Sequence, residues 1–302
     1  MPELPDVTVY VESIAERVKG EPLRAVRVAS PFVVRTFDPP LSAAAGKRVL
    51  EVRRLGKRIV FVLEDGLFLV VHLMIAGRFK WLDAGAKIPA KVGLAAFDFP
   101  SGTLLLTEAA TKKRASIHLA RSLDEFRRPG IEPLESTREE FEAALRRENH
   151  TLKRSLTDPR LFSGIGNAYS DEILHRAKLS PALLTQKMSA DDVAALHRST
   201  RTVLTEWTQR LREEARTGFP EKVTAFRPDF AVHGKYRQPC PVCGTAVQRI
   251  AYADNETNYC PRCQTGGKLL SDRSLARLLH DDWPRTIEEL EEKFPAPRKS
   301  SG

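Results

Sequence analysis

Two pairs of cysteines in the C-terminal part constrain the fold of this chain more than any other feature. They read CPVC and CPRC with sixteen residues between the pairs, and they are all the cysteines in the sequence: Cys240, Cys243, Cys260 and Cys263. Two C-x-x-C pairs at this spacing are typical of a tetrahedral zinc site, and two disulfides or four unrelated thiols are the alternatives. The first residues show no basic and apolar leader, so we expect no secretory signal and favour zinc. Four thiolates leave the ion no open coordination position, so we predict one structural zinc ion.

The charge balance favours a polyanionic partner. Lysine and arginine number 48 against 39 aspartates and glutamates, a formal net charge of +9. Binding to phosphates releases condensed counterions, which favours nucleic acid for a basic chain. No apolar run approaches the roughly 20 residues of a membrane span. We therefore expect a cytoplasmic protein that does not bind membranes.

Hydrophobic periodicity divides the chain into regions. Residues 6–19 have the period of an amphipathic helix, and residues 23–119 alternate as strands with turns at EDG and PSG. A linker is expected at RRPGIEPLE, which is rich in proline and glycine. Helices are expected at STREEFEAALRREN and over residues 151–217. Beyond the cysteines, DRSLARLLHDDW has one apolar face, formed by Leu275, Leu278, Leu279 and Trp283. We expect this face to dock on the body of the protein rather than to bind a partner.

Two short stretches leave alternatives open when they are taken alone. GIGN, with Gly164, Gly166 and Asn167, lies between two helical runs and could bind a phosphate through backbone N–H groups or only close a turn. The opening MPELPDV places Pro2 where removal of Met1 would leave a free amine. That amine is a candidate nucleophile, and a disordered start is the alternative.

Five stretches together resemble the formamidopyrimidine-DNA glycosylase/endonuclease VIII family, in the order in which that family has them. They are PELPDV, LGKRIVF, GIGNAYSDEILHRAKLSP, VHGKYRQPC and the four-cysteine finger. The PELP start is closer to the formamidopyrimidine branch. The resemblance covers roughly residues 2–264 and implies an α+β fold. In such enzymes an N-terminal β-sandwich flanked by helices precedes a helical helix-two-turn-helix domain with a C-terminal zinc finger, and DNA lies between the domains. The parts we expect are a catalytic β-sandwich (2–120), a linker and helix (121–150), a helix-two-turn-helix domain (151–220), a zinc finger (232–265) and a helical extension (266–302).

The resemblance also implies roles for individual residues. Pro2 would attack C1′ of a flipped damaged nucleotide and expel the base as a Schiff base forms. An α-amine is roughly a few hundred times richer in free base at neutral pH than a lysine amine, which agrees with this role. Glu3 would protonate the opening sugar or relay protons, and Lys57 would assist base departure or elimination. Lys153 and Asn167 match family positions that hold phosphates. Taken alone, Glu3 could be only a helix N-terminal acid and Lys57 a solvated hairpin charge.

The chain departs from the family at the residues that contact DNA around the lesion. Asn255 stands where the family finger has an arginine, and Arg249 or Arg262 could compensate for that lost charge. Ile75, beside Met74, stands where a methionine usually fills the gap left by the flipped base.

Two further family features have no counterpart in this sequence. The arginine and phenylalanine fillers are missing, and the loop that would carry them is basic, with Lys112, Lys113 and Arg114. A histidine upstream of that loop is missing as well, since AKVGLAAF contains none.

The resemblance implies a base-excision-repair DNA glycosylase that removes oxidised bases and has lyase activity at abasic sites. We expect a monomer whose partner is damaged DNA, duplex or single-stranded, with a shifted lesion range or a preference for single-stranded or abasic DNA. A non-catalytic damaged-DNA-binding protein on the same scaffold is the alternative. A bare zinc-ribbon binding module is a distant third, because it leaves the N-terminal motif unexplained.

Overall fold

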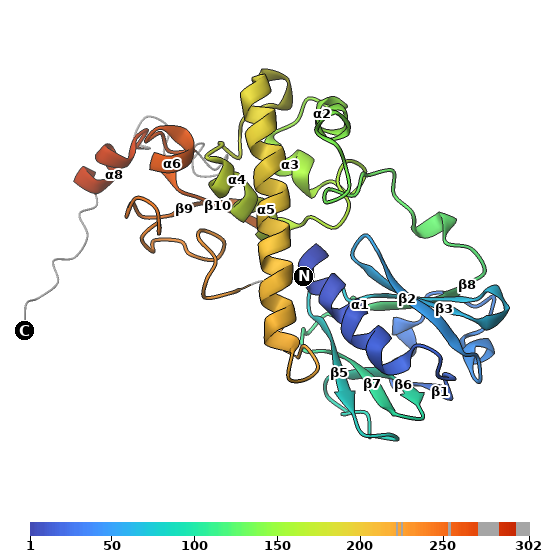
Figure 1. Ribbon diagram of the computed structural model, residues 1–302. Helices are drawn as coiled ribbons and strands as arrows, with labels where there is room; N and C mark the ends of the chain where they lie inside the picture. The colour runs from blue at the N-terminus through green and yellow to red at the C-terminus, as the bar shows by residue number, and fades with distance from the viewer. Residues whose placement is uncertain (222, 225, 253–254, 271–283, 294–302) are drawn as a thin grey trace, which may run out of the picture. The chain divides into compact units, whose positions relative to one another are not determined.

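The computed structural model describes residues 1–221, 223–224, 226–252, 255–270 and 284–293 (Figure 1). The chain divides into two compact units, and each is described by itself. Unit 1 contains residues 1–129 and 204–225, and unit 2 contains residues 130–203 and 226–302.

Unit 1 begins with helix α1, Leu4–Val18, which starts two residues earlier than the sequence pattern predicts. The earlier start is possible because Pro5 lies in the first turn, where a helix does not need its N–H. The backbone N–H of Glu3 donates to the Asp6 carboxylate at 3.0 Å. Gly20, with φ of 87°, follows the helix in the left-handed region.

The strands of unit 1 form two four-stranded antiparallel sheets, as the alternating sequence pattern predicts. One sheet has the order β1-β6-β7-β5 and the other β2-β3-β4-β8. The strands are β1 Ala25–Val28, β2 Val49–Leu55, β3 Arg58–Leu63, β4 Phe68–His72, β5 Gly77–Leu82, β6 Gly93–Phe99, β7 Gly102–Glu108 and β8 Ser116–Ala120. EDG joins β3 to β4 and PSG joins β6 to β7, at the predicted turns.

One hydrophobic core joins the two sheets and α1. Its buried residues include Tyr10 and Ile14 of α1, Phe61 of β3, and Phe79 and Phe97 of the other sheet. Figure 1 shows α1 lying along these strands. Unit 1 is therefore a β-sandwich flanked by a helix, the predicted architecture.

The first part of unit 2 is helical. Its helices are α2 Arg138–Arg146, α3 Leu152–Thr157, α4 Asn167–Ala177 and α5 Ala190–Ala215, of which residues 204–215 belong to unit 1. Helix α2 begins with a capping box, in which Thr137 Oγ1 accepts the Glu140 N–H and the Glu140 carboxylate accepts the Thr137 N–H. Gly164, with φ of 80°, lies in the turn that leads to α4.

The cysteine module completes unit 2. Strands β9 Gln248–Tyr252 and β10 Asn255–Tyr259 form an antiparallel hairpin that leads into helix α6, Pro261–Thr265. Helix α8, Ile287–Lys293, lies next to this module, with the Ile287 N–H donating to the Gly267 carbonyl at 2.9 Å. The predicted apolar face at residues 275–283 lies outside the described residues.

Candidate active site, DNA contacts and zinc centre

The N-terminal residues are buried although they precede the first helix. Pro2 is buried and Glu3 is 2% exposed. The α-amine belongs to Met1 in the chain as described, and burial lowers its pKa below the ordinary value of an α-amine. A lowered pKa leaves more of an amine in its nucleophilic free-base form at neutral pH.

Lys57 lies at the tip of a two-residue turn between β2 and β3. Leu55 pairs with Arg58 across this turn, and Gly56 has φ of 61°. The first residue of such a turn has a positive φ, which glycine adopts readily. Gly56 therefore takes the first position of the turn and Lys57 the second. The positive charge of Lys57 contributes to lowering the pKa of the α-amine, and the negative charge of Glu3 raises it. The structure therefore brings the predicted groups Pro2, Glu3 and Lys57 into one electrostatic environment.

Arg78 of β5 also influences the pKa of the α-amine, and the sequence interpretation did not identify this residue. After burial and Glu3, its charge has the largest effect on the pKa of the α-amine, which it lowers. Its guanidinium donates to the carbonyls of Val223 and, at 2.6 Å, Gly77. No motif marks Arg78, because its position follows from the packing of β5 rather than from a local pattern.

The buried amine gives a pH prediction. In the protein that begins at Pro2, burial should lower the pKa of the Pro2 amine as it lowers that of the Met1 amine. The rate of Schiff-base formation should therefore rise with pH as the amine loses its proton, with a midpoint below that of a free peptide. The measurement is the borohydride-trapping rate of the Pro2-terminated protein against pH, compared with a synthetic Pro-Glu-Leu-Pro peptide. A midpoint at or above that of the peptide would contradict the role of burial.

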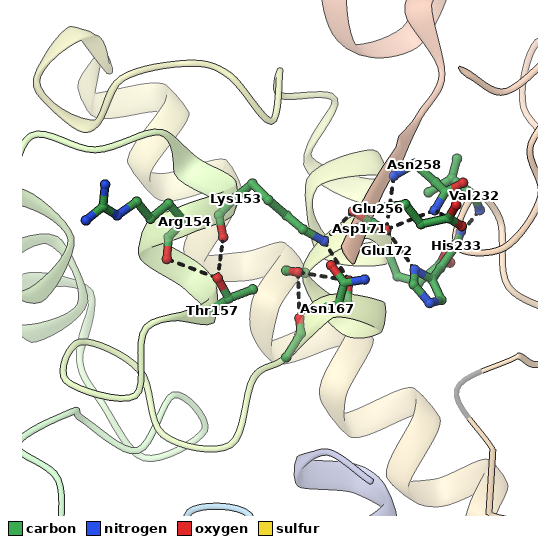
Figure 2. A network of polar contacts seen from close by, with 12 residues as sticks. Lys153, Arg154, Thr157, Asn167, Asp171, Glu172, Val232, His233, Glu256 and Asn258 are labelled. Atoms are coloured by element: carbon green, nitrogen blue, oxygen red, sulfur yellow. Dashed lines mark hydrogen bonds and ion pairs between the residues drawn. The ribbon is translucent and has the colours of Figure 1, made fainter. Parts of the chain in front are cut away.

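The predicted phosphate contacts come from two helices: Asn167 is the first residue of α4, and the side chain of Lys153 reaches it from α3 (Figure 2). Lys153 Nζ donates to the Asn167 carbonyl at 2.6 Å and to Asp171 Oδ1 at 2.5 Å. The Asp171 side chain is fully buried, and the Lys153 side chain is 13% exposed. The lysine charge is therefore balanced by a carboxylate within the chain. Contact of either residue with phosphate stays a prediction.

Asp171 and Glu172 connect α4 to the segment that precedes the first cysteine pair. Asp171 Oδ2 lies 2.8 Å from His233 Nδ1 and accepts the Asn258 N–H at 3.1 Å. The Glu172 carboxylate accepts three successive backbone N–H groups, those of residues 231–233, at 2.8 to 2.9 Å. Burial raises the pKa of Glu172, and these three N–H groups lower it. Figure 2 shows both carboxylates pointing toward the finger segments.

Replacing Glu172 with glutamine should loosen this connection. A glutamine amide has one oxygen acceptor and turns an NH₂ toward the remaining backbone donors. Each buried donor left unpaired costs about 1–3 kcal/mol, so the amides of residues 231–233 should exchange roughly five- to 150-fold faster. Hydrogen exchange measures this, with replacement of the exposed Glu140 of α2 (Glu140→Gln) as the control. Unchanged protection in Glu172→Gln would contradict the connection.

The altered finger position places a polar residue where the family has a cation. Asn255 is the first residue of β10, and its backbone pairs with Tyr252. The two arginines that could compensate have partners within the chain. Arg249 lies over the Tyr236 ring at 4.4 Å and 3.4 Å from Glu256, while Arg262 donates to Thr245 Oγ1 at 3.1 Å. Contact of Asn255 with DNA remains a prediction.

The positions that replace the family's gap-filling residues are open to solvent. Ile75 is 50% exposed, and Met74 beside it has φ of 53°. Lys112 and Lys113 are exposed in the loop after β7. The buried Glu108 carboxylate accepts the Arg114 N–H at 2.8 Å and holds the end of this loop.

The four cysteine sulfurs lie within 4.8 Å of one another. Cys243 Sγ is 3.4 Å from Cys260 Sγ, and Cys240 Sγ is 4.0 Å from Cys263 Sγ. A tetrahedral ion with Zn–S bonds of about 2.3 Å places its sulfurs roughly 3.8 Å apart, so this arrangement fits zinc. Val232 and Val247 pack around the buried Cys240 and Cys260. The four cysteines are the ligands of a structural zinc ion, as predicted.

Comparison with known proteins agrees with this arrangement along most of the chain. Three family profiles match the chain. Residues 1–125 match the formamidopyrimidine-DNA glycosylase N-terminal domain, and residues 130–215 match the formamidopyrimidine-DNA glycosylase H2TH domain. Residues 237–266 match the zinc finger found in FPG and IleRS. The formamidopyrimidine-DNA glycosylase of Pelotomaculum thermopropionicum is 31% identical over 277 residues, covering 87% of this chain and 99% of the relative. The chain belongs to the formamidopyrimidine-DNA glycosylase family.

Other family members extend the comparison. The formamidopyrimidine-DNA glycosylase of Thermus thermophilus is 33% identical over 276 residues, covering 88% of this chain and all of the relative. A solved complex of Lactococcus lactis Fpg with DNA containing an abasic site has a TM-score of 0.76 and 25% identity, covering 87% of this chain and 99% of that one. The resemblance found in the sequence and the predicted fold class are thus confirmed.

Within the described ranges, no helix combines the length and the apolar character needed to cross a bilayer.

Proposed function

We propose that this protein is a base-excision-repair DNA glycosylase with abasic-site lyase activity. The observation that carries the proposal is membership of the glycosylase family along nearly the full length of its relatives, together with the buried N-terminal Pro2-Glu3 pair. Damaged DNA is the proposed partner, because the solved relative from Lactococcus lactis is described in complex with DNA containing an abasic site. The cytoplasm is the proposed location.

The chemistry we propose begins with removal of Met1. The Pro2 nitrogen then forms a bond to C1′ of the damaged nucleotide, and the bond from C1′ to the base breaks as the base departs. The Glu3 carboxylate takes the N–H proton of the attached Pro2 nitrogen and passes it to the sugar ring oxygen. The bond from C1′ to this oxygen breaks as the nitrogen lone pair forms the C1′=N bond, which leaves a Schiff base between Pro2 and C1′. Lys57 supplies a positive charge to the departing base or to the phosphate eliminated afterwards. Arg78 and Lys57 lower the pKa of the Met1 α-amine, and we expect their charges to favour the free-base form of the Pro2 amine in the same way.

The phosphate contacts we propose come from unit 2. Asn167 is the first residue of α4, and the Lys153 ammonium group reaches it from α3. Backbone N–H groups and the helix dipole at this end of α4 favour an anion. Asn255 would add a neutral hydrogen bond from the finger hairpin. A phosphate that binds Lys153 competes with Asp171 for its ammonium group.

The test of the proposal separates an enzyme from a non-catalytic binder. Zinc-loaded protein, with Pro2 verified as its first residue by mass spectrometry, is mixed with oligonucleotides carrying one abasic site or one oxidised purine. We expect strand incision at the abasic site and release of the oxidised base, both sharply reduced in Pro2→Gly. Tight binding of these oligonucleotides without incision or base release would support the non-catalytic alternative and contradict the proposal.

The altered DNA contacts give a substrate prediction. Because the family's gap-filling side chains are replaced by Ile75 and a basic loop, an intact duplex should hold the flipped state less well than an open structure. We expect faster base release from single-stranded or bubble DNA than from duplex DNA of the same sequence. Single-turnover rates on the matched substrates measure the ratio. Equal rates would contradict a preference for open DNA.

A further inference from the structure

Helix α4 makes one contact with the zinc centre that is separate from the carboxylates described above. His175 lies near its C-terminal end, and Nε2 is 3.2 Å from Cys240 Sγ. The histidine is 6% exposed and Cys240 is 2% exposed, so water does not compete for this contact. The two residues are 65 positions apart in the sequence.

The chemistry of the pair fixes the direction of this hydrogen bond. A zinc-bound cysteine is a thiolate and can only accept, so the imidazole nitrogen that faces it carries the hydrogen. The four thiolates already complete a tetrahedral site, which leaves the imidazole outside the coordination sphere. Residues that hold metal ligands from this outer position commonly change metal affinity by about 10–100-fold when they are replaced.

We propose that His175 is an outer-sphere residue of the zinc centre, donating its Nε2–H to the Cys240 thiolate and attaching α4 to the metal site. Donation to the sulfur withdraws electron density from it and fixes the Cys240 side chain. The inference rests on the zinc site alone and does not depend on the glycosylase activity.

The position of His175 on α4 gives the contact a wider consequence. Asn167 is the first residue of the same helix, eight residues away, a distance of about 12 Å along the axis at 1.5 Å per residue. Asp171 and Glu172 lie between them and contact the segments around the finger. One helix therefore carries both the predicted phosphate contact and a ligand-holding residue of the zinc site.

The experiment compares metal release from the full-length, zinc-loaded protein and its variants. His175→Phe keeps an aromatic ring but removes the donor, and His175→Gln keeps an N–H near the same place. His197→Phe is the matched control, because His197 packs against Phe141 and contacts the Ser136 carbonyl. Transfer of zinc to a chromogenic chelator should be about tenfold or more faster in His175→Phe. It should be close to the wild-type rate in His175→Gln and His197→Phe.

A spectroscopic readout distinguishes hydrogen-bond donation from simple packing. In the cobalt(II)-substituted protein, loss of the donor raises the energy of the sulfur electrons, so the sulfur-to-cobalt charge-transfer band of His175→Phe should move to longer wavelength. The band of His175→Gln should stay near the wild-type position. A His175→Phe protein that releases zinc at the wild-type rate and keeps its charge-transfer band at the wild-type wavelength would overturn the proposal. If His175→Phe does not fold, His175→Gln decides, and release tenfold faster than wild type in that variant would also overturn it.

Discussion

Replacing Cys260 with serine should abolish zinc binding and unfold the finger. Cys260 is fully buried and lies where β10 ends and α6 begins. A structural zinc ion supplies on the order of 10 kcal/mol to the folding of such a module, far more than the hairpin and the short helix supply themselves. The measurements are zinc content per chain and hydrogen exchange of residues 240–265.

The control for this prediction is Val242→Ser, in the same cysteine pair. Val242 is 64% exposed, so the substitution removes little buried surface and should leave the zinc in place. DNA affinity should fall in Cys260→Ser and remain in Val242→Ser if the finger contributes to binding. A Cys260→Ser protein that retains one tightly bound zinc per chain would contradict the four-cysteine site.

Replacing Glu3 with glutamine should reduce the rate of base release by about 10²–10⁴-fold, the range typical of a lost general acid or base. Glutamine keeps the backbone N–H that donates to Asp6, and it keeps a side-chain oxygen of similar placement. The fold of α1 and binding of DNA should therefore remain. Single-turnover base release and DNA affinity, measured on the same preparation, separate the two effects.

Glu12→Gln is the matched control on the same helix. Glu12 pairs with Arg212 at 2.6 Å on a partly exposed surface, where a salt bridge contributes little. We expect base release within a small factor of wild type in this variant. A Glu3→Gln protein as fast as Glu12→Gln would show that Glu3 is only part of the helix start.

Features set by local sequence could be predicted. The cysteine spacing identifies the zinc ligands, because two C-x-x-C pairs satisfy a tetrahedral ion. The alternating residues before and after Gly56-Lys57 place Lys57 at a hairpin tip, where the structure has it. The sequence pattern places the start of α1 two residues too late. Proline usually argues against a helix, but Pro5 lies in the first turn, where the helix does not need its N–H.

The contacts that organise the site could not be predicted, since they join residues far apart in the chain. Asp171 contacts Lys153, 18 positions away, and His233, 62 positions away. In the sequence, SDEILH is typical only of a helix with polar residues, and nothing in it indicates which partners its carboxylates have. Arg78 likewise reaches the environment of the amine only through the packing of β5 in the sandwich.

The central claim is that the Pro2 amine forms the covalent intermediate. Protein verified to begin at Pro2 is mixed with DNA containing one abasic site, reduced with borohydride and digested, and the cross-linked peptide is sequenced by mass spectrometry. We predict a stable adduct in which the DNA is attached to the N-terminal peptide at the nitrogen of Pro2, with far less adduct in Pro2→Gly. An adduct on a lysine such as Lys57, or no adduct from protein that binds the same DNA, would contradict the account.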